Sequence, residues 1–169
     1  TKLVDKQTEI NNAKPISLSN ISAFNGGWEW NNVEPTDSFG NNYSTACNYV
    51  VFSDFQDTIY NQKGYCGSAN GYSQVFAEYR TNGEYNMLSM QLAPHTEIRQ
   101  NGKTFIQIYA DDTLIYTSPT ITRKTDAFVC EVGIAGAEYI KIVVNVLHTE
   151  LGLRSDGAIL IADAQLWPK

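Results

Sequence analysis

Two tryptophans placed two positions apart are the residues of this chain best suited to binding chemistry. The segment GGWEWNN contains Trp28, Glu29, Trp30, Asn31 and Asn32. Indole rings can stack on the apolar C–H faces of a sugar, while carboxylate and amide groups hydrogen-bond its hydroxyls. The alternative is that one or both rings close the end of a hydrophobic core. We take these five residues as candidate ligand-binding residues in a loop.

Four further residues could complete such a site. They are Tyr65, Tyr72, His148 and Arg154, of which the last two lie in the loop before the last predicted strand. The alternative for His148 and Arg154 is an ordinary solvent-exposed turn. The second histidine, His95, is expected to be a surface residue.

A structural calcium ion is a weaker expectation, and we predict no other cofactor. Calcium takes six to eight oxygen ligands, often from loop carboxylates and carbonyls. The available aspartates are Asp54, Asp57, Asp111, Asp112, Asp156 and Asp163, without EF-hand spacing. The pair Asp111-Asp112 is better explained by the chemistry of a tight turn.

The sequence gives little support for an enzyme. Neither of the 2 histidines lies in a zinc-binding spacing, and there is no nucleophile elbow or phosphate-binding glycine loop. A glycosidase would need two carboxylates across a cleft. Glu29, Glu34 and Asp37 are candidates by type, but a small domain of this kind offers no large cleft. We therefore predict a non-catalytic protein.

The three cysteines fall into two groups. Cys130 lies in the alternating segment DAFVCEV and is expected to be a small buried hydrophobic residue. Cys47 and Cys66 lie in loop-rich sequence and could be bridged or free. The sequence leaves both alternatives open.

Composition limits the class of protein. The chain has 169 residues, 43% of them hydrophobic and 18% charged, which favours a polar linker or arm at 1–15 followed by one globular domain at 16–169. The net charge of −6 and the lack of a basic stripe argue against nucleic acid. No apolar run approaches the roughly 20 residues that span a bilayer. Neutral glycans or proteins remain as partners, and the abundance of Ser, Thr, Asn and Tyr suits an exported bacterial protein.

Hydrophobic patterning predicts an all-β fold. Short runs of β-branched and aromatic residues alternate with Asp, Gly, Asn and Pro, a pattern typical of strands and turns. The predicted strands are residues 16–24, 49–55, 74–80, 85–92, 105–110, 113–117, 128–132, 139–147 and 157–167. Residues 139–147 should form a central strand that is buried on both faces. Residues 25–49 should form long loops on a sandwich of two mainly antiparallel sheets.

An ordered set of short motifs gives a resemblance to a known family. The motifs are KGYC (63–66), EYR (78–80), GEY (83–85), FIQIYADDTLIYTS (105–118), VGIAGA (132–137) and ADAQL (162–166). In this order the chain resembles the NPCBM family, the "novel putative carbohydrate-binding module", related to carbohydrate-binding module family 51. The resemblance covers roughly residues 16–166. It implies a jelly-roll β-sandwich that binds sugars and is linked to a secreted or surface-attached glycoside hydrolase or surface-protein module.

The chain departs from the family pattern at two places. Gly67 and Ser68 stand where the family often has a histidine. The family also often ends in DHADWADA, whereas residues 156–161 of this chain read DGAILI and lack the histidine and the tryptophan. If those positions line the sugar site in relatives, this chain binds differently or has lost that site. The alternative function is therefore a structural or protein-interaction domain of a surface protein without sugar binding.

Overall fold

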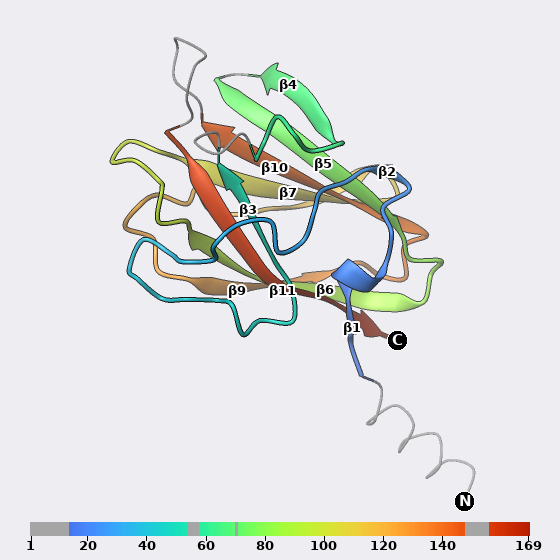
Figure 1. Cartoon of the computed structure of the whole chain (residues 1–169). Coiled ribbons are helices and arrows are strands. Elements are labelled where there is room, and N and C mark those ends of the chain that lie inside the picture. The colour runs from blue at the N-terminus through green and yellow to red at the C-terminus, as the bar shows by residue number, and fades with distance from the viewer. Residues whose placement is uncertain (1–13, 54–57, 70, 148–155) are drawn as a thin grey trace, which may run out of the picture.

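The structure is a computed structural model that describes residues 14–53, 58–69, 71–147 and 156–169 (Figure 1). Within these residues it contains strands and one 3-10 helix, η1, at Leu18–Asn20. The strands are β1 (Ile16–Ser17), β2 (Asn25–Gly26), β3 (Tyr49–Ser53), β4 (Tyr65–Ala69), β5 (Tyr72–Arg80), β6 (Tyr85–Pro94), β7 (Thr104–Ala110), β8 (Thr113–Thr117), β9 (Phe128–Gly133), β10 (Tyr139–Leu147) and β11 (Ala158–Pro168). None of the helical structure in these ranges could cross a lipid bilayer.

The strands form two antiparallel sheets that face each other as two layers (Figure 1). One sheet has the order β1-β11-β6-β9, with β3 also paired to β11. The other has the order β2-β5-β10-β7-β8, with β4 also paired to β5. The predicted all-β sandwich of two antiparallel sheets is therefore confirmed.

The hydrophobic core lies between the two layers because alternate residues of each strand point inward. On β5, for example, Val75, Ala77 and Tyr79 are buried, while the residues between them are only partly buried. Leu88 and Leu92 of β6 meet this layer from the other sheet and are also buried. This frame leaves the outer face of each sheet and the connecting loops available for other roles.

Several predicted strands match the structure closely. Residues 113–117 and 139–147 coincide with β8 and β10, and β10 lies between β5 and β7 as a central strand should. The β7–β8 turn is made by Asp111 and Asp112, with φ of 45° and 65°. Positive φ at both positions is typical of a type I′ hairpin turn, which Asp tolerates better than most residues.

The prediction of one long first strand at residues 16–24 is wrong. The strand β1 ends at Ser17, whose hydroxyl accepts a hydrogen bond from the Ser19 amide and starts the 3-10 turn. Phe24, at the end of the predicted strand, is 44% exposed, and the Arg80 guanidinium lies over its ring at 4.5 Å. Strand β4 is missing from the sequence prediction, because its Gly67 interrupts any alternation.

The expectation that His95 lies at the surface is also wrong. The side chain is 2% exposed, and its Nε2 lies 3.0 Å from the Glu34 carbonyl oxygen. The Glu97 amide donates to Nδ1 at 3.4 Å, so Nε2 carries the proton and donates to Glu34. Burial lowers the pKa of His95, although both nearby glutamates act in the opposite direction.

The three cysteines differ in burial, and none of them is paired. Cys130 on β9 is 3% exposed, which confirms the predicted buried residue. Cys47 and Cys66 are exposed and unpaired. Cys47 precedes β3 of one sheet and Cys66 lies on β4 of the other.

Candidate functional site

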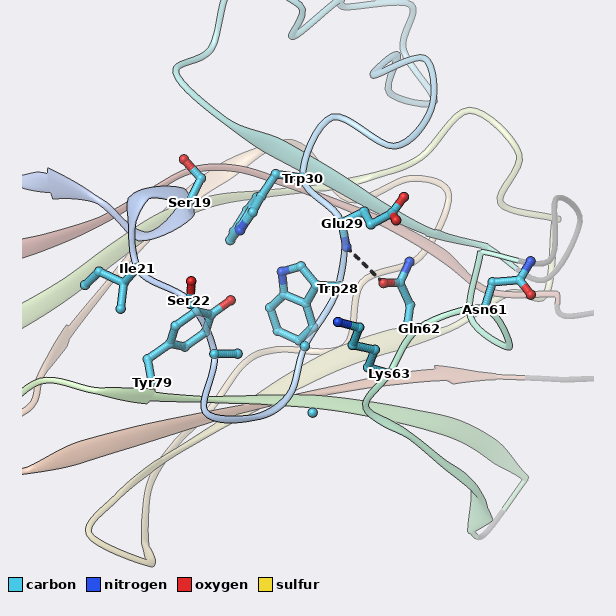
Figure 2. A pocket seen from close by; sticks show the side chains of 13 residues that line it. Ser19, Ile21, Ser22, Trp28, Glu29, Trp30, Asn61, Gln62, Lys63 and Tyr79 are labelled. Atoms are coloured by element: carbon cyan, nitrogen blue, oxygen red, sulfur yellow. Dashed lines mark hydrogen bonds between the residues drawn. The ribbon is translucent and has the colours of Figure 1, made fainter.

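A cleft of about 350 Å³ lies between two segments of the chain that both contact β5. One loop runs through residues 21–30 and the other through residues 61–63. Its walls include Trp28, Trp30 and Tyr79, and we call it the indole pocket (Figure 2). The volume falls in the range of roughly 300–1,000 Å³ that is usual for small-ligand sites.

Glycine residues allow both loops to lie directly against β5. The Gly27 amide donates to the Phe76 carbonyl at 3.0 Å, and the Gly64 amide donates to the Gly27 carbonyl at 3.2 Å. Phe76 in turn donates to the Gly64 carbonyl at 3.1 Å. Gly26 has a φ of 63°, a left-handed conformation that glycine adopts without strain. The backbone of β5 therefore fixes where each wall of the pocket stands.

The two indoles are half-buried and pack edge to face, with ring centroids 6.1 Å apart. Trp28 also packs against Phe52 at 5.1 Å and Tyr79 at 6.4 Å. Both tryptophans contact the hydrophobic core while lining the pocket. Each ring is thus held by core packing and still presents part of its surface to the cleft.

Polar groups surround the rings. The Glu29 amide donates to Oε1 of Gln62 at 3.0 Å, which ties the two loops together. Figure 2 shows Glu29, Gln62 and Lys63 on one side of the indoles, and Ser19 and Ser22 on the other. A carboxylate, an amide, an ammonium and hydroxyls therefore border the aromatic surface.

The indole nitrogens differ in their hydrogen bonding. Trp30 donates from its side chain to the Tyr79 hydroxyl, yet burial dominates and raises the pKa of Tyr79 well above its ordinary value. The Nε1 of Trp28 is buried and has no hydrogen-bond partner among the described residues. An unpaired buried donor costs free energy, so this nitrogen adds to the cost of packing the Trp28 ring against the core.

Of the residues predicted from sequence, Trp28, Glu29 and Trp30 line the indole pocket. Asn31 and Asn32 follow them but do not line it. The Asn32 side chain instead bonds the backbone of Val51 in both directions, at 2.8 and 3.0 Å. It holds the loop against β3.

The remaining predicted residues lie elsewhere. Tyr72 is on the outer face of β5, where its ring packs against Phe105 at 5.2 Å. Tyr65 packs against Tyr60 at 5.0 Å. His148 and Arg154 lie outside the described residues.

Sequence reasoning missed most of the residues that line the pocket. Ser19, Ser22, Gln62, Lys63 and Tyr79 come from three separate segments of the chain. Lys63 and Tyr79 belong to motifs that carried the family resemblance, but nothing in their spacing connects them to Trp28. Only the pairing of both loops with β5 brings them together.

The carboxylates considered for hydrolysis are not gathered in the pocket. Asp37 is 1% exposed and accepts hydrogen bonds from the Phe39 and Asn41 amides and the Tyr43 hydroxyl. Burial acts to raise the pKa of Asp37, but these hydrogen bonds lower it below its ordinary value. Asp37 therefore organises a turn. Among the three candidates only Glu29 lines the pocket.

The calcium expectation is not tested by this structure. Asp54 and Asp57 lie outside the described residues. Among the residues that the structure describes, no group of three or more His, Cys, Asp or Glu side chains is placed to bind a metal ion. Asp111 accepts hydrogen bonds from the Glu138 and Tyr139 amides, and Asp163 accepts one from Cys47.

Solved structures with a similar fold include several carbohydrate-binding modules. A Clostridium perfringens ZmpB structure that contains an M60 catalytic domain and two CBM51 domains aligns with a TM-score of 0.55 at 16% identity, over 92% of this chain and 15% of that one. The CBM51 of Clostridium perfringens GH95, solved in complex with methyl-galactose, aligns with a TM-score of 0.53 at 15% identity, over 90% and 99%. The tandem CBM51 modules of Sp3GH98, a family 98 glycoside hydrolase of Streptococcus pneumoniae, give 0.52 at 14% identity, over 92% and 47%.

These likenesses establish the fold. The chain spans about a seventh and a third of the first two matching chains. No curated protein sequence matches it. The NPCBM/NEW2 domain matches residues 60–165, well over half of the sequence. The chain therefore belongs to the NPCBM/NEW2 domain family.

Proposed function

We propose that this carbohydrate-binding module holds a neutral glycan in the indole pocket and carries out no catalysis. The observation that carries the proposal is the pair of half-buried indoles bordered by Glu29, Gln62 and Lys63. Sugar C–H faces would contact the indole surface, and sugar hydroxyls would hydrogen-bond the surrounding polar groups.

The module would act by localisation. A single open site pays the entropy of association with few contacts, so its affinity for one sugar is modest. Linkage to a glycoside hydrolase or to other modules of a surface protein raises the effective concentration at the glycan. We propose that the chain belongs to a secreted or cell-surface bacterial protein and keeps its partner close to glycan.

Titration of the indole pocket tests this function. We expect Trp30→Ala to weaken binding of a neutral sugar by roughly tenfold or more, because truncating a central aromatic anchor costs about 1–2 kcal/mol. The first probe is methyl-galactose, the ligand in the structure of the GH95 module, followed by a panel of neutral glycans. Binding is measured by calorimetry and by the indole N–H signals in NMR spectra.

Two further variants keep the test sharp. Trp28→Phe removes the indole N–H but retains an aromatic ring against Phe52, so it disturbs the core less than an alanine variant would. Phe39→Ala is the matched control, because Phe39 is 54% exposed and does not line the pocket. Full affinity in folded Trp30→Ala protein would place the sugar elsewhere. If the wild-type chain bound none of the neutral glycans, the alternative of a structural or protein-interaction domain would be favoured.

A further inference from the structure

A second groove lies on the outer face of the sheet that contains β5, β10 and β7. It has a volume of about 230 Å³. Gln74 and Phe76 of β5 form one wall, and Gln107 and Tyr109 of β7 form the other. Between them runs β10, in which Val143 stands opposite both Phe76 and Gln107. The groove shares no lining residue with the indole pocket.

A chain of side-chain amides crosses the three strands beside this groove. Gln74 Nε2 donates to Asn145 Oδ1 at 2.7 Å, and Asn145 Nδ2 donates to Gln107 Oε1 at 3.3 Å. Asn145 is 1% exposed. Burying the Asn145 amide costs free energy that these hydrogen bonds only offset. An apolar residue at position 145 would serve the fold equally well. The amides are nevertheless held rigidly, as a binding surface requires.

The hydrogen bonds of this amide chain run from Gln74 through Asn145 to Gln107, so the donor group of Gln107 remains at the end of the chain. Both hydrogen-bonding groups of Asn145 are used within the chain. Gln107 receives its bond on Oε1, and in the described part of the molecule its Nε2 donates to no other side chain. Because the amide is already oriented, a hydroxyl oxygen of a ligand could accept from Nε2 at little entropic cost.

A single cation lies in the groove. The Lys141 ammonium is 5.0 Å from the Phe76 ring centroid and 5.7 Å from that of Tyr109. Glu78 stands opposite Lys141 in the register but accepts from the Asn25 side chain. Within the described ranges no carboxylate lies at ion-pair distance from Lys141. The ammonium therefore has aromatic faces beside it and can still bind an anion.

We propose that this groove is a second binding site, specific for a saccharide residue that carries one carboxylate. The carboxylate would bind Lys141, and hydroxyls of the same sugar ring would bind the amide of Gln107. The charges of the protein limit the class of ligand. The one cation in the groove suits a single carboxylate, whereas the net charge of −6 on the whole protein disfavours a polyanion. The proposal does not depend on the indole pocket.

Methyl glucuronide and its uncharged methyl ester are the matched probes. We expect the acid to shift the side-chain amide signals of Gln74, Gln107 and Asn145 in NMR spectra and to bind roughly tenfold or more tightly than the ester, because a charge-assisted hydrogen bond is lost in the ester. Binding should weaken as salt is added. Equal binding of acid and ester, or amide signals that do not move, would overturn the proposal.

Variants separate this site from the first. Lys141→Met should abolish the preference for the acid and leave methyl-galactose binding unchanged, while Lys124→Met, at an exposed position outside the groove, should alter neither. In a Cys47→Ser background, a bulky maleimide on the exposed Cys66 at the groove wall should block the acid only. An unchanged preference for the acid in Lys141→Met, or unchanged binding of the acid after maleimide labelling, would refute the assignment. If Lys141→Met or the labelled protein lost only methyl-galactose binding, this sugar would not bind in the indole pocket.

Discussion

Among single residues, Trp28 both packs against the hydrophobic core and lines the indole pocket, which the sequence offered as alternatives. Its ring packs on Phe52 and Tyr79, as a residue closing the core would. It also lines the indole pocket next to Trp30. Core packing holds the ring in one orientation, so the surface it presents to a ligand is organised before binding.

His95 should make stability depend on pH. Its neutral form is buried between the Glu34 carbonyl and the Glu97 amide, and burial lowers its pKa below the ordinary 6.5. The folded state therefore binds fewer protons than the unfolded state. The stabilisation is present above about pH 6.5 and is lost as the pH falls below it. We expect the urea midpoint to drop between about pH 7.5 and pH 5.5.

The variant His95→Gln isolates this group, because the glutamine amide replaces the ring N–H as a hydrogen-bond donor and does not titrate. Its urea midpoint should change less over the same pH range than that of the wild type. The other histidine, His148, is present in both proteins and cancels in the comparison. Identical pH dependence in the two proteins would contradict the assignment to His95.

At the scale of elements, the pocket depends on how closely the loop at residues 61–64 approaches β5. A Cβ atom at Gly64 would lie 1.8 Å from the Phe76 carbonyl oxygen, which is backbone and cannot turn aside. We expect Gly64→Ala to destabilise the protein by about 1–3 kcal/mol, as overpacking usually does. It should also weaken sugar binding in the indole pocket, because Gln62 and Lys63 move with the loop.

Gly133→Ala on β9 is the matched control. A Cβ atom there would meet nothing within 4 Å, so its effect on stability should stay within about 0.5 kcal/mol. Denaturant unfolding and calorimetric titration of the two variants provide the measurement. Wild-type stability and affinity in Gly64→Ala would show that the loop does not need its contact with β5.

At the scale of the whole molecule, the three thiols should report on the fold separately. Cys47, which precedes β3, and Cys66 on β4 are both exposed, whereas Cys130 is 3% exposed and burial raises its pKa. We expect two thiols to react quickly with Ellman's reagent in native protein and the third to react only after unfolding. Fewer than two fast thiols in freshly reduced protein would contradict the exposed positions of Cys47 and Cys66.

Local sequence patterns were enough to predict the strands with strong periodicity. Alternation and a turn pair of aspartates gave β8 and its hairpin, and a continuous apolar run gave β10 as the central strand. Ordered motifs gave the family. These features are local, because side-chain period and turn chemistry act over a few residues. The position of Trp28 and Trp30 in a loop was likewise readable from their neighbours.

Which residues share a site depends on contacts between distant parts of the chain. Tyr72 belongs to the same strand as Tyr79, yet it points to the outer face while Tyr79 lines the indole pocket. His95 has no local pattern that predicts burial, because the Glu34 carbonyl that its ring bonds lies 61 residues earlier in the chain. Lys63 meets Trp28 only through shared pairing with β5. Long-range strand pairing sets these contacts, and no short stretch of sequence encodes it.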